Sequence, residues 1–233
     1  MAEKRVSTGI LGFDTLINGG FDYHSINLVA GGSGSGKSIF ALQFLLSGIK
    51  NRERVLYVTF EEKKKEFYDD MKQVGWDLEK AEKSGKFLFL EYSPEKVKMM
   101  LDEGGGAIES IVLKNKITRI VIDSISSFSL LFDGEQARRK AILGLFDIIR
   151  KWDVTTLLTV QHNPSSKKDH GGLSYVEFEA DSIVLLYYVR TGPTRQRFLE
   201  VLKMRGTKHS KEMHSFTIDR GINIGAVATV KIK

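Results

Sequence analysis

The 233-residue sequence is 42% hydrophobic and carries 35 Lys and Arg against 29 Asp and Glu, a net charge of +6. It has no cysteine, which excludes disulfides, thiolate zinc sites and cysteine nucleophiles, and its five histidines lack the spacing of metal ligands. The dispersed positive charge leaves an anionic partner open but is typical of ordinary solubility. With no apolar leader and no apolar run of membrane-spanning length, we expect a soluble cytoplasmic protein that makes no membrane contact.

The first half of the sequence alternates short apolar strands with helices. Residues 26–30 predict a buried strand that ends in a glycine-rich loop. Residues from 37 to about 48 are apolar on nearly every side, as in a helix packed within the core. A strand at 54–60 is followed by the charged run 61–66 and a helix reaching about residue 74. Further strands are predicted at 87–90, 119–123 and 155–160, with helices from Pro94 to the glycines at 104–106 and from about 135 to 151.

The order of these elements indicates the fold class. The strand at 119–123 is apolar on both faces, which is typical of a parallel sheet covered by helices on each side. After Asp181 the pattern changes to successive strands, and Thr191-Gly192-Pro193 is typical of a hairpin turn. We therefore expect residues 1–233 to form one α/β domain with a mostly parallel sheet and an antiparallel C-terminal extension. The strands of that extension are predicted at 183–189, 198–203, 215–218 and about 227–232.

The loop at residues 31–38 reads Gly-Gly-Ser-Gly-Ser-Gly-Lys-Ser and fits a phosphate-binding pattern between a strand and a helix. Glycines let the backbone N–H groups surround phosphates, and the helix N-terminus favours anions. A flexible glycine turn is the alternative, but the strand–loop–helix order disfavours it. We expect Lys37 to reach the β- and γ-phosphates and Ser38 to ligate Mg²⁺. The residues expected to bind ATP are Gly31, Ser33, Gly34, Ser35, Gly36, Lys37, Ser38 and Ile39.

Polar side chains follow three predicted strands. Asp123 ends an apolar strand and is expected to help hold the Mg²⁺. If the strand before Glu61 and Glu62 neighbours the loop strand, one carboxylate can orient a water for attack on the γ-phosphate. Otherwise this pair simply begins a solvated helix. Gln161 ends the last parallel strand, where its amide either contacts the γ-phosphate or only satisfies the strand end.

Several other segments complete a pattern that runs along nearly the whole chain. They are Ser7-Thr8-Gly9-Ile10, Phe13-Asp14, Gly19-Gly20, Gly75-Trp76-Asp77-Leu78, Ile122-Asp123-Ser124, Lys203-Met204-Arg205-Gly206-Thr207 with His209, and Phe216-Thr217-Ile218 with Asp219 and Gly221-Ile222. Together with the loop and the double glutamate, this pattern resembles the RecA-like P-loop ATPases, most closely the KaiC/RadA branch. The double glutamate and the Lys-Met-Arg-Gly-Thr stretch are its most specific parts.

The resemblance implies that Glu61 activates the attacking water and that ATP lies between the subunits of a ring, usually a hexamer. It also implies that a neighbouring subunit supplies Lys203 and Arg205, and a trans-acting arginine can contribute about 10³–10⁵ in rate. We therefore expect a Mg²⁺-dependent, ring-forming ATPase whose nucleotide state drives conformational signalling or partner binding. The positions that match further contacts with the neighbouring nucleotide are Thr207, His209 and Asp219.

Two other functions remain open. One is a RadA/RecA-like ATPase that binds single-stranded DNA through residues 163–172, a loop with Lys167, Lys168 and His170 but no aromatic platform. The other is an autokinase, although serines after a strand are common turn residues. The serines in question are Ser124, Ser126, Ser127 and Ser129.

The sequence also departs from the family. Circadian-clock KaiC carries two ATPase domains in tandem whereas one is expected here, so clock-type autophosphorylation is not expected. Nor do we expect the helical DNA-binding extension that precedes the core of RadA recombinases. His24 stands where family members often have glycine.

Overall fold

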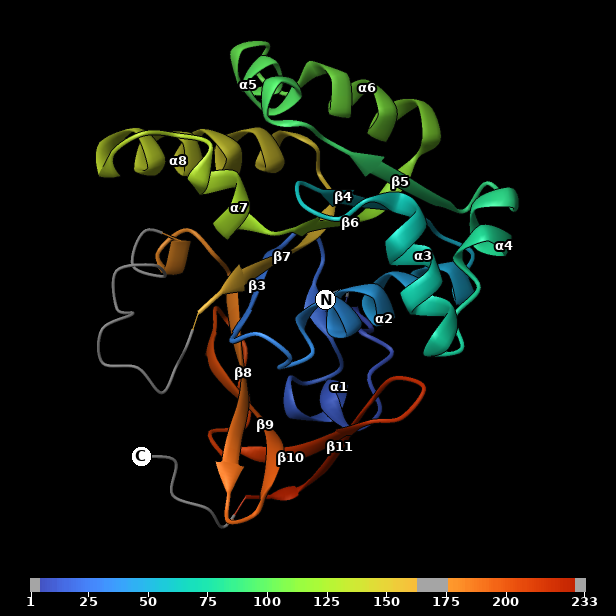
Figure 1. The fold of residues 1–233 in the computed structure, drawn as a ribbon, viewed down its shortest axis with the longest axis vertical. Helices are drawn as coiled ribbons and strands as arrows, with labels where there is room; N and C mark the ends of the chain where they lie inside the picture. Colours follow the sequence, from blue (N-terminus) through green and yellow to red (C-terminus); the bar gives the residue numbers. More distant parts are fainter. Residues whose placement is uncertain (1–4, 163–175, 229–233) are drawn as a thin grey trace.

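The computed structural model describes residues 5–162 and 176–228, and its main feature is a nine-stranded sheet (Figure 1). Its strands are β3 (Ile26–Gly31), β4 (Arg54–Thr59), β5 (Phe87–Glu91), β6 (Ile117–Asp123), β7 (Thr155–Gln161), β8 (Ser182–Thr191), β9 (Thr194–Met204), β10 (His214–Ile218) and β11 (Ile222–Val227). Their order is β11-β10-β9-β8-β3-β7-β6-β4-β5. The pairs from β8 to β5 are parallel, and β9, β10 and β11 are antiparallel additions. The predicted fold class is confirmed.

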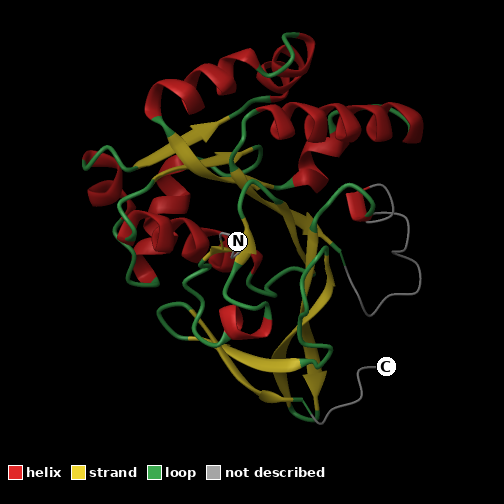
Figure 2. Cartoon of the chain, turned by 180° about the vertical axis from the view of Figure 1, so that it is seen from behind, coloured by secondary structure: helices red, strands yellow, loops and turns green. Residues whose placement is uncertain are grey.

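Helices cover both faces of the parallel strands (Figures 1 and 2). On one face lie α1 (Phe13–Leu16), α2 (Lys37–Lys50), α3 (Lys64–Gln73) and α4 (Leu78–Lys83), and on the other α5 (Pro94–Asp102), α6 (Gly106–Asn115), α7 (Ile125–Leu130) and α8 (Glu135–Lys151). Successive side chains of one strand enter opposite cores: Leu28 packs with α8, whereas Val29 packs with α2. This explains the continuous apolar runs in the sequence. No helix in the two described ranges is long and apolar enough to cross a membrane.

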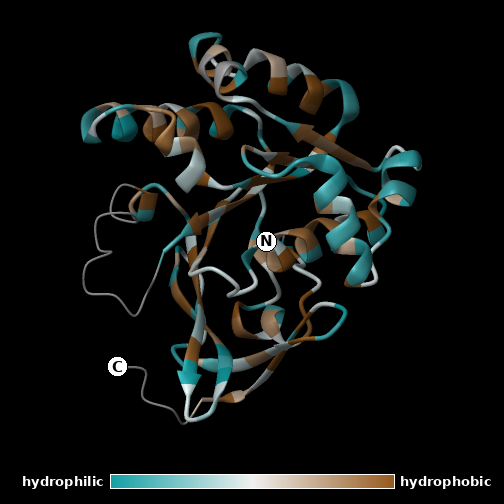
Figure 3. Cartoon of the chain, viewed as in Figure 1, coloured by the Kyte–Doolittle hydropathy of each residue, from teal (hydrophilic) through white to brown (hydrophobic). Residues whose placement is uncertain are grey.

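The two helices that follow β3 and β4 differ in character. Helix α2 has buried residues on most sides and is largely brown in Figure 3, as predicted for a core helix. Helix α3 buries only one side, through Phe67, Tyr68 and Met71, and is largely teal. The rigid packing of α2 fixes the direction in which its N-terminus points.

Some elements differ from the sequence prediction. The short helices α1, α4 and α7 were not predicted, since four to six residues carry little periodicity. The last strand was predicted at about 227–232, but β11 covers Ile222–Val227 because a tight turn at 219–221 returns the chain from β10. Residues 229–233 lie outside the described residues.

Strand β6 is less apolar than predicted, because Arg119 is buried within it. Its guanidinium forms a two-pronged ion pair with Glu53, at 2.6 and 2.8 Å, and also donates to the carbonyl oxygens of Ser7 and Phe44. Desolvation alone would raise the pKa of Glu53, but hydrogen bonds from Arg119 and Thr118 and the charge of Arg119 outweigh it and lower that pKa. Arg119 thereby fastens the N-terminal segment to α2 and the sheet.

His24 precedes β3 in a left-handed conformation, with φ of 59°. Glycine adopts this conformation without steric cost, whereas a residue with a side chain does not. In this chain the imidazole Nδ1 of His24 lies 2.5 Å from the carboxylate of Asp153.

Candidate functional site

The loop between β3 and α2 leaves no room for side chains at two of its glycines. A Cβ atom at Gly31 would lie 2.5 Å from Ser35 Oγ and 2.6 Å from the carbonyl oxygen of Leu186. Gly36 has φ of 105° and precedes the first residue of α2. The N–H groups of the first turn of α2, which have no acceptor within the helix, therefore follow directly on the loop. Ser33 and Gly34 are exposed, Ser35 is buried, and Ile39 is half-buried in the first turn.

Lys37, the first residue of α2, folds its side chain back over this loop. Its Nζ donates to the carbonyl oxygens of Gly31 (2.9 Å) and Gly32 (3.0 Å) and to Oε1 of Gln161 (3.2 Å). Desolvation lowers the pKa of Lys37, and the charges of Asp123 and Glu61 partly offset that effect. The structure thus brings Lys37 and Gln161 together, because β7 lies beside β3.

Asp123, at the end of β6, is surrounded by hydroxyl donors. Its Oδ2 accepts from Ser38 Oγ (2.9 Å) and from the phenol of Tyr57 (2.6 Å), and its Oδ1 accepts from Thr159. Burial, with Asp123 beside it, raises the pKa of Tyr57 well above its ordinary value, so Tyr57 remains a donor. These contacts place Ser38 and Asp123 together, as predicted, although Tyr57 was not singled out.

Glu61 and Glu62 lie in the connection between β4 and α3, before the helix begins at Lys64. They are therefore not part of its first turn. Strand β4 does not neighbour β3, since β7 and β6 lie between them, so the condition set for an approach of the carboxylates is not met. Glu61 nevertheless reaches the end of β6, where its Oε1 accepts from Ser124 Oγ at 3.2 Å.

Glu62 lies at the surface but is partly desolvated by its surroundings. This desolvation, followed by the charges of Asp123 and Glu61, raises the pKa of Glu62 to about 7. A carboxyl with such a pKa exchanges protons near neutral pH.

The four serines after Asp123 all make local contacts. The hydroxyl of Ser124 accepts from the backbone N–H of Ser127 at the start of α7 and lies 2.9 Å from Ser127 Oγ. Ser126 Oγ accepts from the backbone N–H of Gln161 and so joins α7 to β7. Ser129 donates to the carbonyl oxygen of Ser126. These contacts give the serines a structural use without any phosphoryl transfer.

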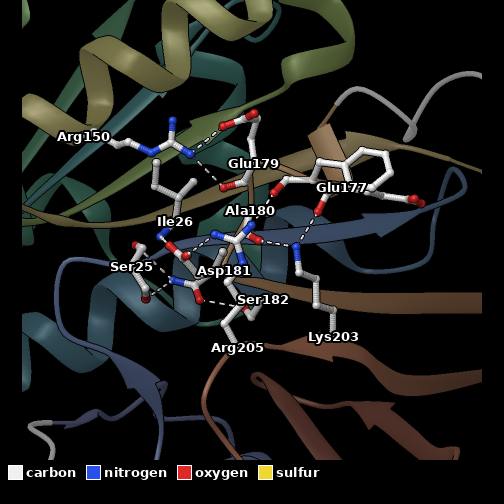
Figure 4. A network of polar contacts seen from close by, with 12 residues as sticks. Ser25, Ile26, Arg150, Glu177, Glu179, Ala180, Asp181, Ser182, Lys203 and Arg205 are labelled. Atoms are coloured by element: carbon white, nitrogen blue, oxygen red, sulfur yellow. Dashed lines mark hydrogen bonds and ion pairs between the residues drawn. The ribbon is translucent and has the colours of Figure 1, made fainter.

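Lys203 and Arg205 lie far from the loop. Lys203 pairs with Ile183 near the start of β8, and the start of β8 lies beside the start of β3. The loop begins at the other end of β3, five residue steps or about 16 Å away. Figure 4 shows both cations gathered against residues 177–181. The structure does not bring them to the loop of their own chain.

Thr207 and His209 follow Arg205 along the chain. The Thr207 hydroxyl accepts from the Arg5 guanidinium at 2.8 Å, and Nδ1 of His209 lies 2.9 Å from the carbonyl oxygen of Ser210. Neither residue contacts the loop through these interactions.

Asp219 is placed differently from these residues. Its neighbour Ile218 approaches the loop, since a Cβ at Gly36 would lie 2.9 Å from Ile218 Cδ1. Ile218 also lines a surface pocket of about 510 Å³, to which no residue of the loop at 31–38 contributes. Asp219 therefore lies on the side of its own chain's loop rather than beside Lys203. The residues that line the pocket are Gln73, Val74, Gly75, Ile218, Asp219 and Arg220.

Two residues beside the loop were missed from the sequence. Nε and a terminal nitrogen of Arg197 donate to the carbonyl oxygen of Gly34 at 3.2 and 3.1 Å, and the guanidinium lies 4.3 Å from the centre of the Tyr188 ring. They come from β9 and β8; β8 lies beside β3 and β9 beside β8, an order that no sequence spacing revealed.

Two expected sites have no counterpart in the described residues. The predicted DNA-binding loop at 163–172 lies outside them. Within 5–162 and 176–228, no cluster of three or more His, Asp and Glu residues could form a metal site alone.

Comparisons with known proteins bear on the fold and the family of the chain. A family model described as "ATPase: KaiC" matches residues 6–228. The chain is 36% identical to the circadian clock protein KaiC3 of Synechocystis and 33% identical to the circadian clock oscillator protein KaiC of Thermostichus vulcanus. These matches cover 99% and 98% of the chain but 47% and 45% of the relatives, so the chain spans about half their length. The crystal structure of a KaiC-like protein from Pyrococcus horikoshii superposes with a TM-score of 0.85 at 34% identity, covering 96% of this chain and all of that one.

Proposed function

The chain belongs to the KaiC family of ATPases, and from this premise we propose that it binds Mg·ATP at residues 31–38 and hydrolyses it between the subunits of a ring. We expect a hexamer in the cytoplasm whose nucleotide state drives conformational signalling or partner binding. The observation that carries the proposal is the junction of β3 and α2, where loop amides, the Lys37 ammonium and the Ser38–Asp123 pair converge.

The loop supplies the groups that a triphosphate requires. Lys37 already lies over the loop, so its ammonium exchanges the carbonyl oxygens of Gly31 and Gly32 for phosphate oxygens. The N–H groups of the loop and of the first turn of α2 add donors, and the helix dipole favours the negative charge. Gln161 also accepts a hydrogen bond from the Lys37 ammonium, so its amide would respond when the γ-phosphate binds or leaves.

Ser38 and Asp123 would hold the Mg²⁺. Mg²⁺ in nucleotide sites takes few protein oxygens and completes its shell with phosphates and water, so a hydroxyl and a carboxylate 2.9 Å apart fit the ion without a larger cluster. When bound, the ion neutralises charge on the phosphates. Tyr57 and Thr159 hold the Asp123 carboxylate in place throughout.

Glu61 is the proposed base. It lies in a connection outside any helix, its side chain is held by Ser124, and its charge acts on Lys37. A carboxylate at this position can orient a water and accept its proton as the bond to the γ-phosphate forms. Glu62, with a pKa of about 7, would support it as a second proton acceptor.

The base of the nucleotide has a candidate position as well. Ile218 contacts Gly36 and also lines the pocket beside Asp219, so a base or ribose that extends past Ile218 would meet the Asp219 carboxylate. Asp219 would then serve the nucleotide of its own chain.

Lys203 and Arg205 would serve a second molecule. They lie one strand length from their own loop, so a nucleotide that they contact must belong to an adjacent copy. Thr207 and His209, which follow them, would lie on the same interface. This arrangement supports the trans-acting role that the family resemblance implies.

Replacing Glu61 with Gln tests the proposal. The Glu61→Gln protein should bind Mg·ATP with nearly wild-type affinity, since the carboxylate is not a phosphate ligand, and should lose hydrolysis by about 10²–10⁴. Calorimetry measures the binding and phosphate release measures the turnover, with Glu66→Gln as a matched control on α3. Wild-type turnover in the Glu61→Gln protein would reject Glu61 as the base.

A further inference from the structure

A short turn ahead of β8 gathers both cations. Lys203 Nζ donates to the carbonyl oxygens of Glu177 and Ala180, each at 2.7 Å. Arg205 donates to the carbonyl oxygen of Phe178 at 2.5 Å and to Oδ1 of Asp181 at 3.3 Å (Figure 4). Three kinds of group therefore meet at this turn: backbone carbonyl acceptors, two cations and one carboxylate.

Asp181 connects this cluster to the strand that carries the phosphate loop. Its Oδ2 accepts from the backbone N–H of Ile26 at 2.9 Å, and its own N–H donates to the carbonyl oxygen of Ile26 at 2.8 Å. Its carbonyl oxygen accepts from the backbone N–H of Arg205 at 2.9 Å. One carboxylate oxygen is therefore fixed to the first residue of β3, while the other faces the guanidinium of Arg205.

The turn itself is held from its other side. Arg150 of α8 donates to the carbonyl oxygen of Glu179 at 3.1 Å and to its carboxylate at 2.6 Å. The carbonyl groups that receive Lys203 and Arg205 are thereby anchored to both β3 and α8, which gives the cations a rigid support.

The cations remain accessible although they are held. The side chain of Arg205 is 54% exposed and that of Asp181 33%. Desolvation, and then the like charge of Arg205, lowers the pKa of Lys203, so two positive charges are kept close together at some cost. Such a pair is stabilised by an approaching polyanion.

We propose that Asp181 is a positioning residue: it orients Arg205, and with it the Lys203–Arg205 pair, toward the phosphates of an ATP molecule bound to an adjacent copy. This inference rests on the proposed trans-acting role of Arg205 and adds the element that aims it. Arg205 presents a fork of donors: Asp181 holds one terminal nitrogen and the Phe178 carbonyl holds the other, which fixes the plane of the guanidinium and directs its remaining N–H groups outward. A misplacement of about 1 Å at such a group can lower a rate about 100-fold.

The test is an Asp181→Asn substitution, which keeps an oxygen acceptor for the Ile26 N–H but removes the charge that orients Arg205. We expect kcat for ATP hydrolysis to fall tenfold or more, with KM for ATP within about twofold of wild type. Glu179→Gln, on the same turn, keeps the backbone contact with Arg150 and a side-chain oxygen for it, so it should lower kcat less than Asp181→Asn does. If Asp181→Asn fails to fold, Asp181→Glu serves instead, since the longer side chain keeps the charge but displaces the carboxylate that faces Arg205, and it should show a fall in kcat of the same kind.

A double substitution separates positioning from simple structural support. If Asp181 acts through Arg205, adding Asp181→Asn to Arg205→Ala should lower kcat no further. An Asp181→Asn protein with wild-type kcat, or an equal fall in both backgrounds, would overturn the inference while leaving the ATPase intact. A wild-type protein that hydrolyses no ATP would instead overturn the proposed function, and this inference with it.

Discussion

The phosphate loop and the turn at 176–181 lie at opposite ends of the same strand, β3, and they are built in opposite ways. The loop is contiguous in sequence and is completed by side chains of its own chain, such as Asp123 and Gln161. The turn gathers Lys203 and Arg205 from the end of β9 and leaves Arg205 half exposed. The loop can bind a ligand within one chain, whereas the turn presents cations that its own loop cannot use.

This contrast explains how one chain can divide a reaction between two copies. Parallel strands collect their catalytic connections at their carboxyl ends, so the loop, Asp123 and Glu61 meet there. The turn lies at the amino end of β3 and faces away from that cluster. Assembly in which one copy's turn meets the next copy's loop would bring the two halves together.

Of the changes that test this difference between loop and turn, Arg205→Ala should have the largest effect on ATP hydrolysis. Because Arg205 would stabilise charge that develops on the neighbouring phosphates, kcat should fall about 10³-fold, as phosphate-release assays would show. Mixing this protein with Lys37→Ala protein should restore part of the activity, because mixed interfaces pair an intact loop with an intact Arg205. If a mixture shown to co-assemble recovers no activity, the loop and Arg205 do not act from different copies.

A moderate effect is expected from the carboxylates beside the loop. Since the pKa of Glu62 is raised to about 7, the folded chain binds a proton there more readily than the unfolded chain between about pH 4.5 and 7. The contribution of Glu62 to stability therefore falls as the pH rises through this window and is at its lowest above pH 7. Glu62→Gln should flatten this part of the dependence of Tm on pH, and should melt higher than wild type at pH 8.

Glu66→Gln provides the matched control for that experiment. Glu66 lies on α3 and only adds to the charge around Glu62, so its removal should change the pH profile less. Identical profiles for wild type and Glu62→Gln would show that Glu62 titrates normally.

The smallest effect is expected at His24, at the same end of β3 as the turn but outside both clusters. Its left-handed conformation costs a non-glycine residue about 1 kcal/mol. The exposed contact with Asp153 stabilises the fold by at most about 1 kcal/mol. His24→Gly should leave the free energy of unfolding near wild type. His24→Ala should be about 1 kcal/mol less stable than His24→Gly in denaturant titrations, with ATP hydrolysis unchanged in both. Equal stability of the two variants would show that the backbone conformation carries no cost.

The fold and the loop could be predicted because their signals are local. Strands buried on both faces read as apolar runs, and the loop's glycines and Lys37 are consecutive. Arg197 and Tyr188 could not be predicted, because their place beside the loop depends on which strand lies next to β3. Arg119 was missed for a related reason, since its partner Glu53 comes from a different part of the chain.

The prediction for Glu61 assumed a strand order that the structure does not have. Its approach to the site does not depend on β4 being next to β3, as the sequence reasoning required, but on Ser124 at the end of β6. Spacing alone left open whether Glu61 orients a water or only begins a solvated helix, and the family resemblance favoured the first. Lys203 and Arg205 were likewise found by resemblance, and only the structure shows that they rest on Asp181 and its neighbours.

Calorimetric titration of Mg·ATP into wild-type and Lys37→Ala protein tests the central claim most directly. Wild type should bind ATP, and Lys37→Ala should bind at least about 100-fold more weakly, because charge-assisted contacts to two phosphates contribute about 3 kcal/mol. Its Tm should stay close to wild type, since Lys37 is only partly buried and mainly contacts loop carbonyls. Well-folded wild-type protein that binds no nucleotide, or Lys37→Ala protein that binds equally well, would contradict the account.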